Sequence, residues 1–412
     1  MDRDSAASPI RVLTFSTLFP NAVNPSHGIF VETRLRHLLR SGRVDARVVA
    51  PVPWFPSTNA RYGRYAAFAR VPAAEVRHGI AILHPRYPVL PKIGMALAPL
   101  LLARAAQPVI ERMIRGGYDF DVLDAHFFYP DGVAAAMLGR SLNKPVVITA
   151  RGSDLNLLPR HRLPRWMIQW ASRQAAAVVT VSAALKDVLL GLGTAPERVQ
   201  VLRNGVDLEL VHPVERAAHR LGPGLNGRTL LSVGNLIPLK GHDLAIRALR
   251  LMPEVELRIA GDGPDRQSLE ALAAQVGVAS RVRFLGKLSQ PELRDYYGTA
   301  DALVLASSRE GWANVLLESM ACGTPVIATA VGGTPEVVTA PEAGVLMKER
   351  TAEALAAAAR HLFLQEPDRA ATRRYAERFD WDATTRGQLA LFERIAGERR
   401  RHFSRDGERA PT

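Results

Sequence analysis

Short apolar runs rich in β-branched residues alternate with helical patterns along nearly the whole chain. In the first half these runs predict strands at 10–14, 46–52, 80–83, 120–123, 145–149, 177–181 and 199–202. In the second half they predict strands at 229–233, 255–259, 282–285, 302–305, 326–328 and 345–347. Because strand and helix alternate, we expect an α/β protein with parallel sheets.

The length of 412 residues exceeds what one hydrophobic core usually serves, so two domains are expected. Between the halves, residues 204–226 carry NGVD, Pro213 and the turn-rich LGPGLNG, which is typical of a linker. We therefore predict two Rossmann-like, doubly wound domains that face a cleft, at 1–205 and 206–380, followed by a helix and basic tail at 381–412. Their ligands should bind at the carboxyl ends of the strands.

Composition changes this picture only through its charge. With 47% hydrophobic and 23% charged residues the chain is an ordinary globular protein, but 53 Lys and Arg against 40 Asp and Glu give +13. An anionic partner is expected: nucleic acid, an acidic membrane surface or a phosphate-bearing substrate. The single cysteine, Cys322, excludes an intramolecular disulfide, suits a reducing compartment and reads as a buried structural thiol.

Membrane crossing and secretion are not expected. The longest apolar run, 93–103, contains Pro99 and is too short to span a bilayer. Asp2 and Asp4 precede a strand-like stretch, which argues against a secretory signal. We expect a cytoplasmic protein that touches a membrane, if at all, at its inner face.

Glycine-containing turns follow several predicted strands of the second half. They read GNLIPLKG at 234–241, AGDGP at 260–264, SSREGWANVLLE at 307–318 and AVGGTPEVV at 330–338. Such turns let backbone amides approach an anion, and a helix that begins there adds a favourable dipole. Any one of them is weak evidence, but together they indicate a phosphate-bearing ligand.

Two glutamates, Glu310 and Glu318, lie within one of these turns. Gly311 breaks the helical pattern, and a helix is predicted to begin near Asn314, a good N-cap residue type. Glu310 would then lie in the loop and Glu318 in the second turn. A carboxylate can accept hydrogen bonds from vicinal hydroxyls, so the pair suits a sugar or ribose; alternatively, Glu310 caps the helix and Glu318 faces solvent.

These features resemble a known family, the retaining GT-B glycosyltransferases of family four, of the bacterial polysaccharide and glycolipid type. Further motifs carry the resemblance: ACGTPVIAT at 321–329, NGVD at 204–207, SHGIFVE at 26–32 and DAHFFYPDG at 124–132. The resemblance covers nearly the whole chain. It implies an acceptor-binding first domain, a donor-binding second domain and a C-terminal helix that returns to the first domain.

The resemblance also implies residue roles. Glu310 would contact the donor sugar, Glu318 the ribose, and Lys240 would neutralise charge on the leaving phosphate. The resemblance also puts a histidine, here His126, beside the reacting anomeric carbon. The candidate catalytic residues are therefore His126, Lys240 and Glu310. The other donor-site candidates are Gly28, Asn235, Gly261, Asp262, Gly263, Gly311, Asn314, Val315 and Leu316, and the backbone of the last three would receive the diphosphate.

Asn235 departs from the family pattern, which usually has an arginine at that position. A lost cation matters because electrostatic stabilisation of the leaving group is commonly the largest catalytic contribution. Our hypothesis is that Arg151, where relatives often have histidine, or Arg309 supplies part of the missing charge.

The first half offers candidates for the acceptor side. His126 follows the strand predicted at 120–123 and, as a neutral imidazole, could hydrogen-bond a sugar hydroxyl or the acceptor, unless it is a satisfied structural histidine. Arg151 and Asp154 are further acceptor candidates, and Asp131 and Asp154 would either orient an acceptor hydroxyl or cap a helix. His27 reads as an ordinary loop histidine.

A literal D-x-D, Asp119 to Asp121, is interpreted as structural because it opens a predicted buried strand. We therefore predict no metal site and no cofactor, with the nucleotide diphosphate sugar as a co-substrate. Turnover should be insensitive to EDTA.

A basic amphipathic helix is predicted at 160–174. Its apolar stripe consists of Leu163, Trp166, Met167, Trp170 and Ala171, flanked by Arg160, Arg162, Arg165 and Arg173. One interpretation is an anionic membrane surface that carries a lipid-linked acceptor. The other is a core-facing helix with a solvated basic edge.

Three other functions are alternatives to the glycosyltransferase. A nucleotide-sugar 2-epimerase would share the architecture without an acceptor, and a nucleotide-sugar binding protein without turnover would fit Asn235. A nucleic-acid binder explains the charge but none of the glycine turns, so no nucleic-acid partner is expected. The donor base, the sugar and the acceptor are not specified by these patterns.

Overall fold

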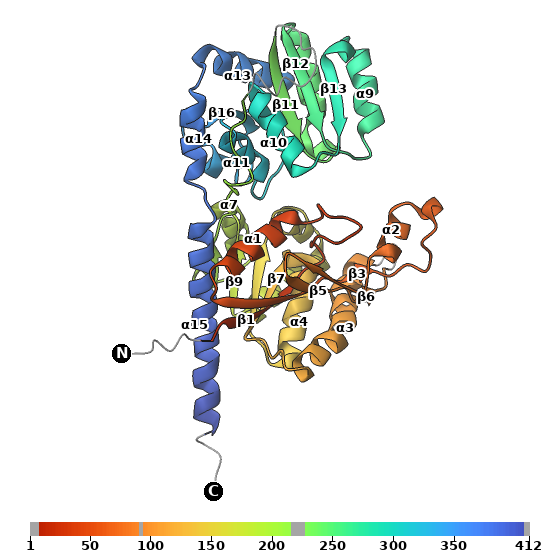
Figure 1. Cartoon of the computed structure of the whole chain (residues 1–412), viewed down its shortest axis with the longest axis vertical. Helices are drawn as coiled ribbons and strands as arrows, with labels where there is room; N and C mark the ends of the chain where they lie inside the picture. Colours follow the sequence, from red (N-terminus) through yellow and green to blue (C-terminus); the bar gives the residue numbers. More distant parts are fainter. Residues whose placement is uncertain (1–7, 90–93, 216–226, 408–412) are drawn as a thin grey trace. The chain divides into compact units, whose positions relative to one another are not determined.

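The structure is a computed structural model that describes residues 8–89, 94–215 and 227–407. The chain folds as two units (Figure 1). Unit 1 comprises residues 1–203 and 382–412, and unit 2 comprises residues 204–381. Residues 221–226 of the predicted LGPGLNG linker lie outside the described residues.

Unit 1 is built on an eight-stranded sheet with the order β10-β9-β8-β7-β1-β2-β5-β4. Every pairing in it is parallel except that of β4 with β5. The strands are β1 (Ile10–Phe15), β2 (Val44–Val49), β4 (Ala74–Arg77), β5 (Ile80–Leu83), β7 (Val122–His126), β8 (Val146–Ala150), β9 (Ala177–Thr180) and β10 (Val199–Val201). A separate short pair joins β3 (Val52–Pro53) and β6 (Arg86–Tyr87).

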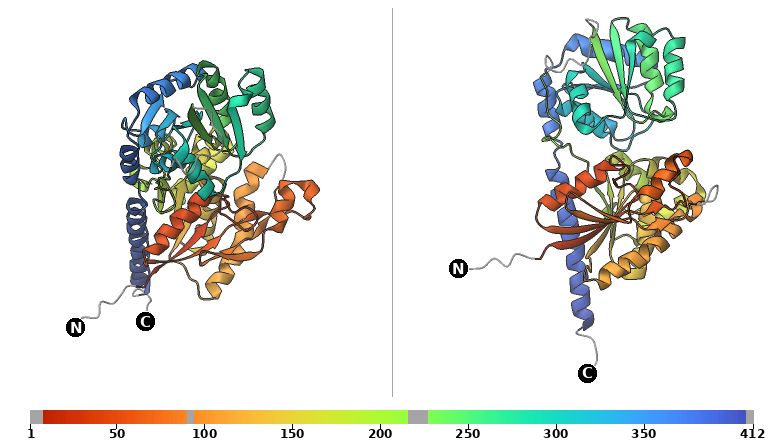
Figure 2. Two further views of the ribbon diagram at one scale, coloured as in Figure 1. Left: turned by 45° about the horizontal axis from the view of Figure 1, so that its top comes forward. Right: turned by 45° about the vertical axis from the view of Figure 1, so that its right-hand side comes forward.

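Helices cover both faces of this sheet (Figures 1 and 2). The helices are α1 (Ile29–Arg40), α2 (Arg64–Arg70), α3 (Gly94–Arg115), α4 (Val133–Leu142), α5 (Ser153–Asn156), α6 (Arg162–Gln174), α7 (Ala183–Gly191) and α15 (Asp382–Gly407). On one face α3, α4 and α6 pack together, and on the other α1 packs against α15. Leu389 and Phe392 of α15 join Val31 and Leu35 of α1 in the core, so the C-terminal helix does return to unit 1.

Unit 2 is built on a six-stranded parallel sheet with the order β13-β12-β11-β14-β15-β16. The strands are β11 (Arg228–Val233), β12 (Val255–Ala260), β13 (Val282–Gly286), β14 (Ala302–Leu305), β15 (Val326–Thr329) and β16 (Gly344–Met347). The helices are α8 (His242–Ala248), α9 (Arg266–Gln275), α10 (Gln290–Thr299), α11 (Asn314–Ala321), α12 (Thr334–Val337), α13 (Ala352–Gln365) and α14 (Arg369–Glu377).

Each sheet contains a point where the chain reverses its direction of travel across the strands. In unit 2 the chain passes from β11 to β12 and β13, and then returns to place β14 on the other side of β11. In unit 1 the equivalent pair is β1 and β7. Since loops diverge at such a point, ligands of open α/β sheets bind there, outside the carboxyl ends of the strands.

One predicted strand is displaced in a way that affects candidate residues. The run predicted at 120–123 is β7 at Val122–His126, so His126 is the last strand residue and does not follow the strand. The D-x-D precedes β7 and does not open it. Phe120 is buried, Asp119 is 57% exposed and accepts from Lys144 at 2.5 Å, and Asp121 accepts from the backbone of Arg11 at 3.0 Å.

Candidate active site

The loops at the carboxyl edge of unit 2 are pressed together, backbone against backbone, at three glycines. A Cβ on Gly241 would lie 2.1 Å from the carbonyl oxygen of Ala306, and one on Gly332 would lie 1.9 Å from that of Glu310. A Cβ on Gly261 would lie 1.9 Å from the oxygen of Gly234. All three glycines have a positive φ, a backbone conformation that residues with a side chain rarely adopt. The glycine turns therefore pack the loops into one surface.

AGDGP belongs to this packing. Its Gly263 also lacks room for a Cβ, which would lie 2.4 Å from the oxygen of Leu236, and Leu236 donates its N–H to the carbonyl of Asp262 at 3.0 Å. The Asp262 side chain accepts from the backbone of Gly263 at 2.8 Å. In this structure Gly261, Asp262 and Gly263 hold the loop after β12 against the loop after β11, and their contact with a donor stays a prediction.

Lys240 and Glu310 meet across the reversal point of unit 2. Lys240 ends the short helix η5 (Pro238–Lys240) after β11, and Glu310 lies in the loop after β14. The Nζ of Lys240 donates to Oε1 of Glu310 at 2.7 Å, and the two side chains are 21% and 11% exposed. The methylenes of Lys240 pass over Gly234, where a Cβ would lie 3.3 Å away. A cation and a carboxylate are thus held together where a ligand of this fold binds.

Glu318 lies on α11, whose N-terminus opens on the same edge. The residue at the N-cap is Ala313, so the expectation that Asn314 caps the helix is wrong: Asn314 is the first helical residue, and its Oδ1 accepts from Asn204 at 3.2 Å. One turn further on, Oε2 of Glu318 accepts from the hydroxyl of the buried Tyr297 at 2.8 Å. Burial raises the pKa of Glu318, and the Tyr297 hydroxyl offsets part of that rise.

Asn235, the residue that departs from the family pattern, is exposed, but its backbone is fixed by His242. Nε2 of His242 donates to the carbonyl of Asn235 at 3.3 Å, so Nδ1 is the acceptor for the hydroxyl of Ser232 at 2.9 Å. Burial lowers the pKa of His242 and keeps the ring neutral. Sequence reasoning missed both Ser232 and His242.

Whether Arg151 or Arg309 supplies the charge that Asn235 lacks stays a prediction. Arg151 belongs to unit 1, and Arg309 belongs to the loop after β14 of unit 2.

In unit 1 the loop after β1 folds over the start of α1. Gly28 is the N-cap residue with φ 66°, and its Cβ would lie 2.3 Å from the oxygen of Leu18. His27 places Nε2 3.1 Å from the carbonyl of Thr17, in keeping with a loop histidine. The backbone and hydroxyl of Thr17 both donate to Asp131, which is fully buried. Burial raises the pKa of Asp131 to about 7.

His126 has both ring nitrogens engaged. Nη2 of Arg151 donates to Nδ1 at 2.7 Å, so Nε2 carries the proton and donates to Oδ2 of Asp124 at 3.0 Å. The ring is 2% exposed, and burial lowers its pKa to about 4. His126 is therefore a neutral imidazole, and a hydrogen bond from it to a sugar would require Arg151 to move. That contact stays a prediction.

The carboxylate of Asp154 holds the loop after β8 by accepting backbone hydrogen bonds. It accepts from the backbone of Phe128 at 2.6 Å, of Arg151 at 3.0 Å and of Gly152 at 2.6 Å. Burial raises its pKa while these three hydrogen bonds oppose the rise. Asp154 lies within α5, whose N-cap residue is Gly152 and whose N-terminus has no side-chain cap, so the interpretation of Asp154 as a helix cap is wrong. A role in orienting an acceptor hydroxyl stays a prediction.

Comparison with known proteins identifies the family. Residues 65–210 match the model described as Glycosyltransferase Family 4, and residues 215–379 match Glycosyl transferases group 1. The D-inositol 3-phosphate glycosyltransferase of Thermobispora bispora is 33% identical over 347 residues, which cover 76% of this chain and 80% of that protein. The chain is a family-four glycosyltransferase.

A second relative agrees with this family, and two solved structures share the fold. The putative teichuronic acid biosynthesis glycosyltransferase TuaC of Bacillus subtilis is 30% identical and covers 85% of this chain and 88% of its own. Sucrose-phosphate synthase of Thermosynechococcus elongatus has a TM-score of 0.77 at 18% identity, over 94% of this chain and all of that one. Anabaena Alr3699/HepE in complex with UDP has a TM-score of 0.70 at 20% identity, over 92% and 98%. These structures share the GT-B fold of two Rossmann-like domains.

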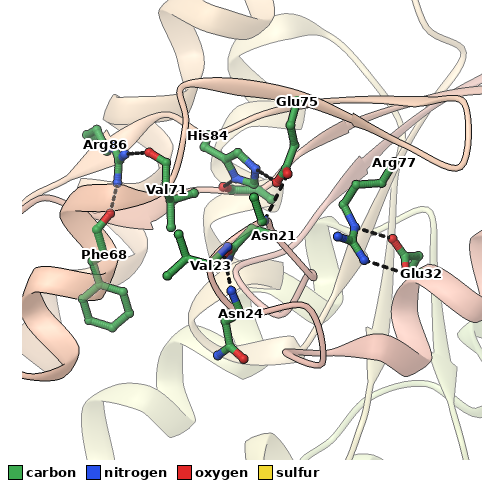
Figure 3. Close-up of polar contacts among 12 residues, drawn as sticks. Asn21, Val23, Asn24, Glu32, Phe68, Val71, Glu75, Arg77, His84 and Arg86 are labelled. Atoms are coloured by element: carbon green, nitrogen blue, oxygen red, sulfur yellow. Dashed lines mark hydrogen bonds and ion pairs between the residues drawn. The ribbon is translucent and has the colours of Figure 1, made fainter. Parts of the chain in front are cut away.

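In the glycosyltransferase, charged residues that sequence reasoning missed contact the loop after β1 and the start of α1 (Figure 3). Glu75 accepts from the backbone of Ala22 at 3.0 Å and lies 2.8 Å from Nε2 of His84, whose Nδ1 lies 2.9 Å from the carbonyl of Ala50. Glu32, the acid of SHGIFVE, is buried and accepts from Arg77 at 2.8 Å. Its place beside Val31 on the buried side of α1 was the available signal.

Helix α6 of the glycosyltransferase buries a different stripe from the predicted one. Of the five predicted apolar positions Ala171 is buried, whereas Leu163 and Trp166 are 43% and 57% exposed. The face toward the protein consists of Pro164, Ile168, Ala171 and Ser172.

Within the described ranges, no helix combines the length and the apolar character needed to cross a bilayer. Cys322 is buried, as predicted, and burial raises the pKa of its thiol to about 12.

Proposed function

We propose that this glycosyltransferase moves a sugar, with retention of anomeric configuration, from a nucleoside diphosphate sugar to a saccharide or lipid-linked acceptor in the synthesis of a cell-surface polysaccharide or glycolipid. The second domain, 206–380, binds the donor, and the first, 1–205, binds the acceptor. The observation that carries this proposal is the Lys240–Glu310 pair at the reversal point of unit 2, with Glu318 on the helix beside it.

Donor recognition follows from the three side chains and the end of α11. The diphosphate lies at the N-terminus of α11, where Asn314 and Val315 present backbone N–H groups and the helix dipole favours an anion. The N–H of Leu316 already donates to the carbonyl of Ala313 at 3.1 Å. Glu318, one turn in, accepts from the ribose hydroxyls through its carboxylate. The HepE structures were solved with UDP and UDP-glucose, which supports a nucleoside diphosphate sugar as the donor.

Charge stabilisation is the role of Lys240 in this mechanism. An ammonium has three N–H donors, and Glu310 accepts one of them, so the others can bind the phosphate oxygens as the glycosidic bond breaks. The negative charge that builds on the leaving phosphate meets a cation already held in place, which requires little reorganisation during the reaction. Glu310 keeps the ammonium oriented and turns its carboxylate to the hydroxyls of the sugar.

The acceptor hydroxyl attacks the anomeric carbon on the face that the nucleotide leaves, and the departing phosphate takes its proton. This route needs no protein nucleophile and no metal, so we expect turnover to be unaffected by EDTA. The relatives support an acceptor that carries sugar or phosphate, since one is named for D-inositol 3-phosphate and another for teichuronic acid synthesis.

A membrane contact through α6 is part of this proposal. Leu163 and Trp166 are exposed beside the exposed Arg160, Arg162 and Arg165. Basic side chains with an exposed tryptophan suit the interface of an anionic bilayer. Flotation with liposomes should need anionic lipid and should be lost in a Leu163→Ser, Trp166→Ser variant; equal recovery with neutral liposomes would remove this part of the proposal.

Product analysis tests the function as a whole. The protein is incubated with a panel of nucleoside diphosphate sugars and saccharide or lipid-linked acceptors, and the new glycosidic linkage is examined by the NMR coupling of its anomeric proton. We expect the anomeric configuration of the donor in the product, with and without EDTA. An inverted linkage would contradict retention, and an epimerised donor with no acceptor product would indicate a 2-epimerase.

A further inference from the structure

The side chain of Arg350 connects the two loops that carry Lys240 and Glu310. Arg350 lies in the loop between β16 and α13. Its Nε donates to the carbonyl of Ala306, after β14, at 2.8 Å, and its Nη2 donates to the carbonyl of Pro238, the first residue of η5, at 3.3 Å. One guanidinium therefore binds both loops, and all of its contacts named here lie within unit 2.

The main chain next to Arg350 is fixed by the start of α13. The hydroxyl of Thr351 accepts the N–H of Ala354 at 3.1 Å and so caps this helix. Helix α13 packs against α8, which begins at His242, two residues after Lys240. Arg350 thus extends from a helix start that is anchored beside the loop to which it binds.

The bond to Pro238 acts on the direction of Lys240. Two backbone contacts also join the loops: the N–H of Ser308 donates to the carbonyl of Leu239 at 2.9 Å, and Gly241 packs against the carbonyl that Arg350 binds. The guanidinium adds a bond at the first residue of η5, while Lys240 is the last. A single turn of this kind has little stability of its own, so its first residue influences where its last one points.

Arginine is suited to this role by its geometry. Its guanidinium is a rigid planar fork, and two of its nitrogens bind two separate carbonyls at once. Lysine carries the same charge, but all of its donors belong to one nitrogen on a flexible stem. Arg350→Lys therefore keeps the positive charge and loses the bridge between the loops.

We propose that Arg350 is a positioning residue for sugar transfer: by bracing η5 to the loop after β14, it holds the Nζ of Lys240 against Glu310. This inference rests on the proposed function, in which that ammonium meets the charge on the leaving phosphate. Arg350 itself contacts no substrate in this account. A misplacement of about 1 Å can cost about 100-fold in rate, so a small movement of η5 is enough to slow turnover.

Steady-state kinetics of sugar transfer test the proposal, with Arg281→Lys as the matched control. Arg281 also braces backbone, because it donates to the carbonyls of Leu249, Met252 and Val255, but it does so at the amino end of the sheet, before β13. We expect Arg350→Lys to lower kcat about tenfold and to change the donor KM less than about threefold. Arg281→Lys should lower the melting temperature at least as much and leave kcat unchanged.

Chemical rescue separates positioning from a general loss of structure. Arg350 and Pro238 line a cavity of about 530 Å³, so a small cation can reach the place of the missing side chain. In Arg350→Ala, methylguanidinium should restore part of the lost kcat, because it offers the same fork of donors. Methylammonium at the same concentration and ionic strength should not restore it.

The reactivity of Lys240 gives a readout that needs no substrate. Trace acetylation with acetic anhydride, followed by peptide mass spectrometry, compares Lys240 with Lys186 of α7 as the internal reference. In Arg350→Lys this ratio should rise about threefold, because the ammonium spends less time bonded to Glu310. In Arg281→Lys the ratio should stay at the wild-type value.

Three results would overturn the inference. They are a kcat of Arg350→Lys equal to that of Arg281→Lys, equal effects of methylguanidinium and methylammonium on Arg350→Ala, and an unchanged reactivity of Lys240. A failure of the proposed function is separable from these results. A wild type that transfers no sugar contradicts the function, while the acetylation of Lys240 still reports on the bracing by Arg350.

Discussion

Removing the hydroxyl of Tyr297 perturbs the carboxylate that we propose binds the ribose while leaving that carboxylate in place. The hydroxyl donates to Oε2 of Glu318 at 2.8 Å, and Tyr297 is buried, so Tyr297→Phe removes one hydrogen bond and little packing. A hydrogen bond to a charged group contributes about 1.5–3 kcal/mol. At about 1.4 kcal/mol per pKa unit, its loss should raise the pKa of Glu318 by roughly 1–2 units.

The pH dependence of nucleotide affinity reports this shift. Only the ionised carboxylate can accept from two ribose hydroxyls, so affinity falls as the pH falls through the pKa of Glu318, which burial has already raised. Isothermal titration of UDP, or of the nucleotide the protein prefers, should show that fall at a pH about 1–2 units higher in Tyr297→Phe.

Tyr296→Phe, the same change one residue earlier on α10, is the matched control and should follow the wild type. Protonation of the nucleotide is common to all variants and cancels in the comparison. Superimposable profiles for wild type and Tyr297→Phe, or an unchanged profile in Glu318→Gln, would refute the assignment of Glu318 to the ribose.

Three further predictions follow from the same contacts. Asp131 binds its proton more tightly in the folded protein (pKa about 7) than in the unfolded chain (about 3.9), so it favours folding at low pH, and this contribution is lost as the pH rises toward 7 and above. Between pH 5 and 8, the free energy of unfolding by urea should therefore fall about 2–3 kcal/mol more in wild type than in Asp131→Asn. Parallel pH profiles of the two proteins would contradict this. Position 261 has no room for a Cβ, so Gly261→Ala should lose several kcal/mol of stability together with nucleotide binding. Gly277 also has positive φ but open space around it, so Gly277→Ala should lose about 1 kcal/mol of stability and keep nucleotide binding. Equal losses in the two variants would count against the packing of the loops. Glu310→Gln removes the carboxylate that accepts from Lys240, so it should slow sugar transfer about 10- to 100-fold while changing the nucleotide Kd less than about threefold. An equal effect on the transfer rate and on the Kd would contradict the separate role of Glu310.

Local patterns in the sequence predict the sheets and the position of the two glutamates. In unit 2, β14 is a continuous apolar run because a central parallel strand is buried on both faces, whereas β12 and β13 include charged residues. Each predicted run there nevertheless overlaps an observed strand. The break at Gly311 likewise places Glu310 in the loop and Glu318 within α11, as the structure has them.

Contacts between distant segments could not be predicted in the same way. Lys240 and Glu310 are 70 residues apart, and Asp124 and Gln388 are 264 apart. Each pair depends on the order of strands in the sheet or on the return of α15, neither of which a local pattern contains. The tautomer of His126 depends in turn on Asp124 and Arg151, so its buried, fully bonded state could not be read from DAHFFYPDG.

The central claim, that unit 2 binds a nucleoside diphosphate sugar through Glu318 and the start of α11, is tested most directly by thermal stabilisation with a panel of nucleosides, nucleoside diphosphates and their sugars. A ligand that binds only the folded protein raises its melting temperature. We predict that one nucleoside diphosphate and its sugar stabilise the wild type, that the nucleoside alone does not, and that Glu318→Gln loses most of the gain. A wild type that no nucleoside diphosphate stabilises, or a gain that Glu318→Gln retains in full, would contradict the claim.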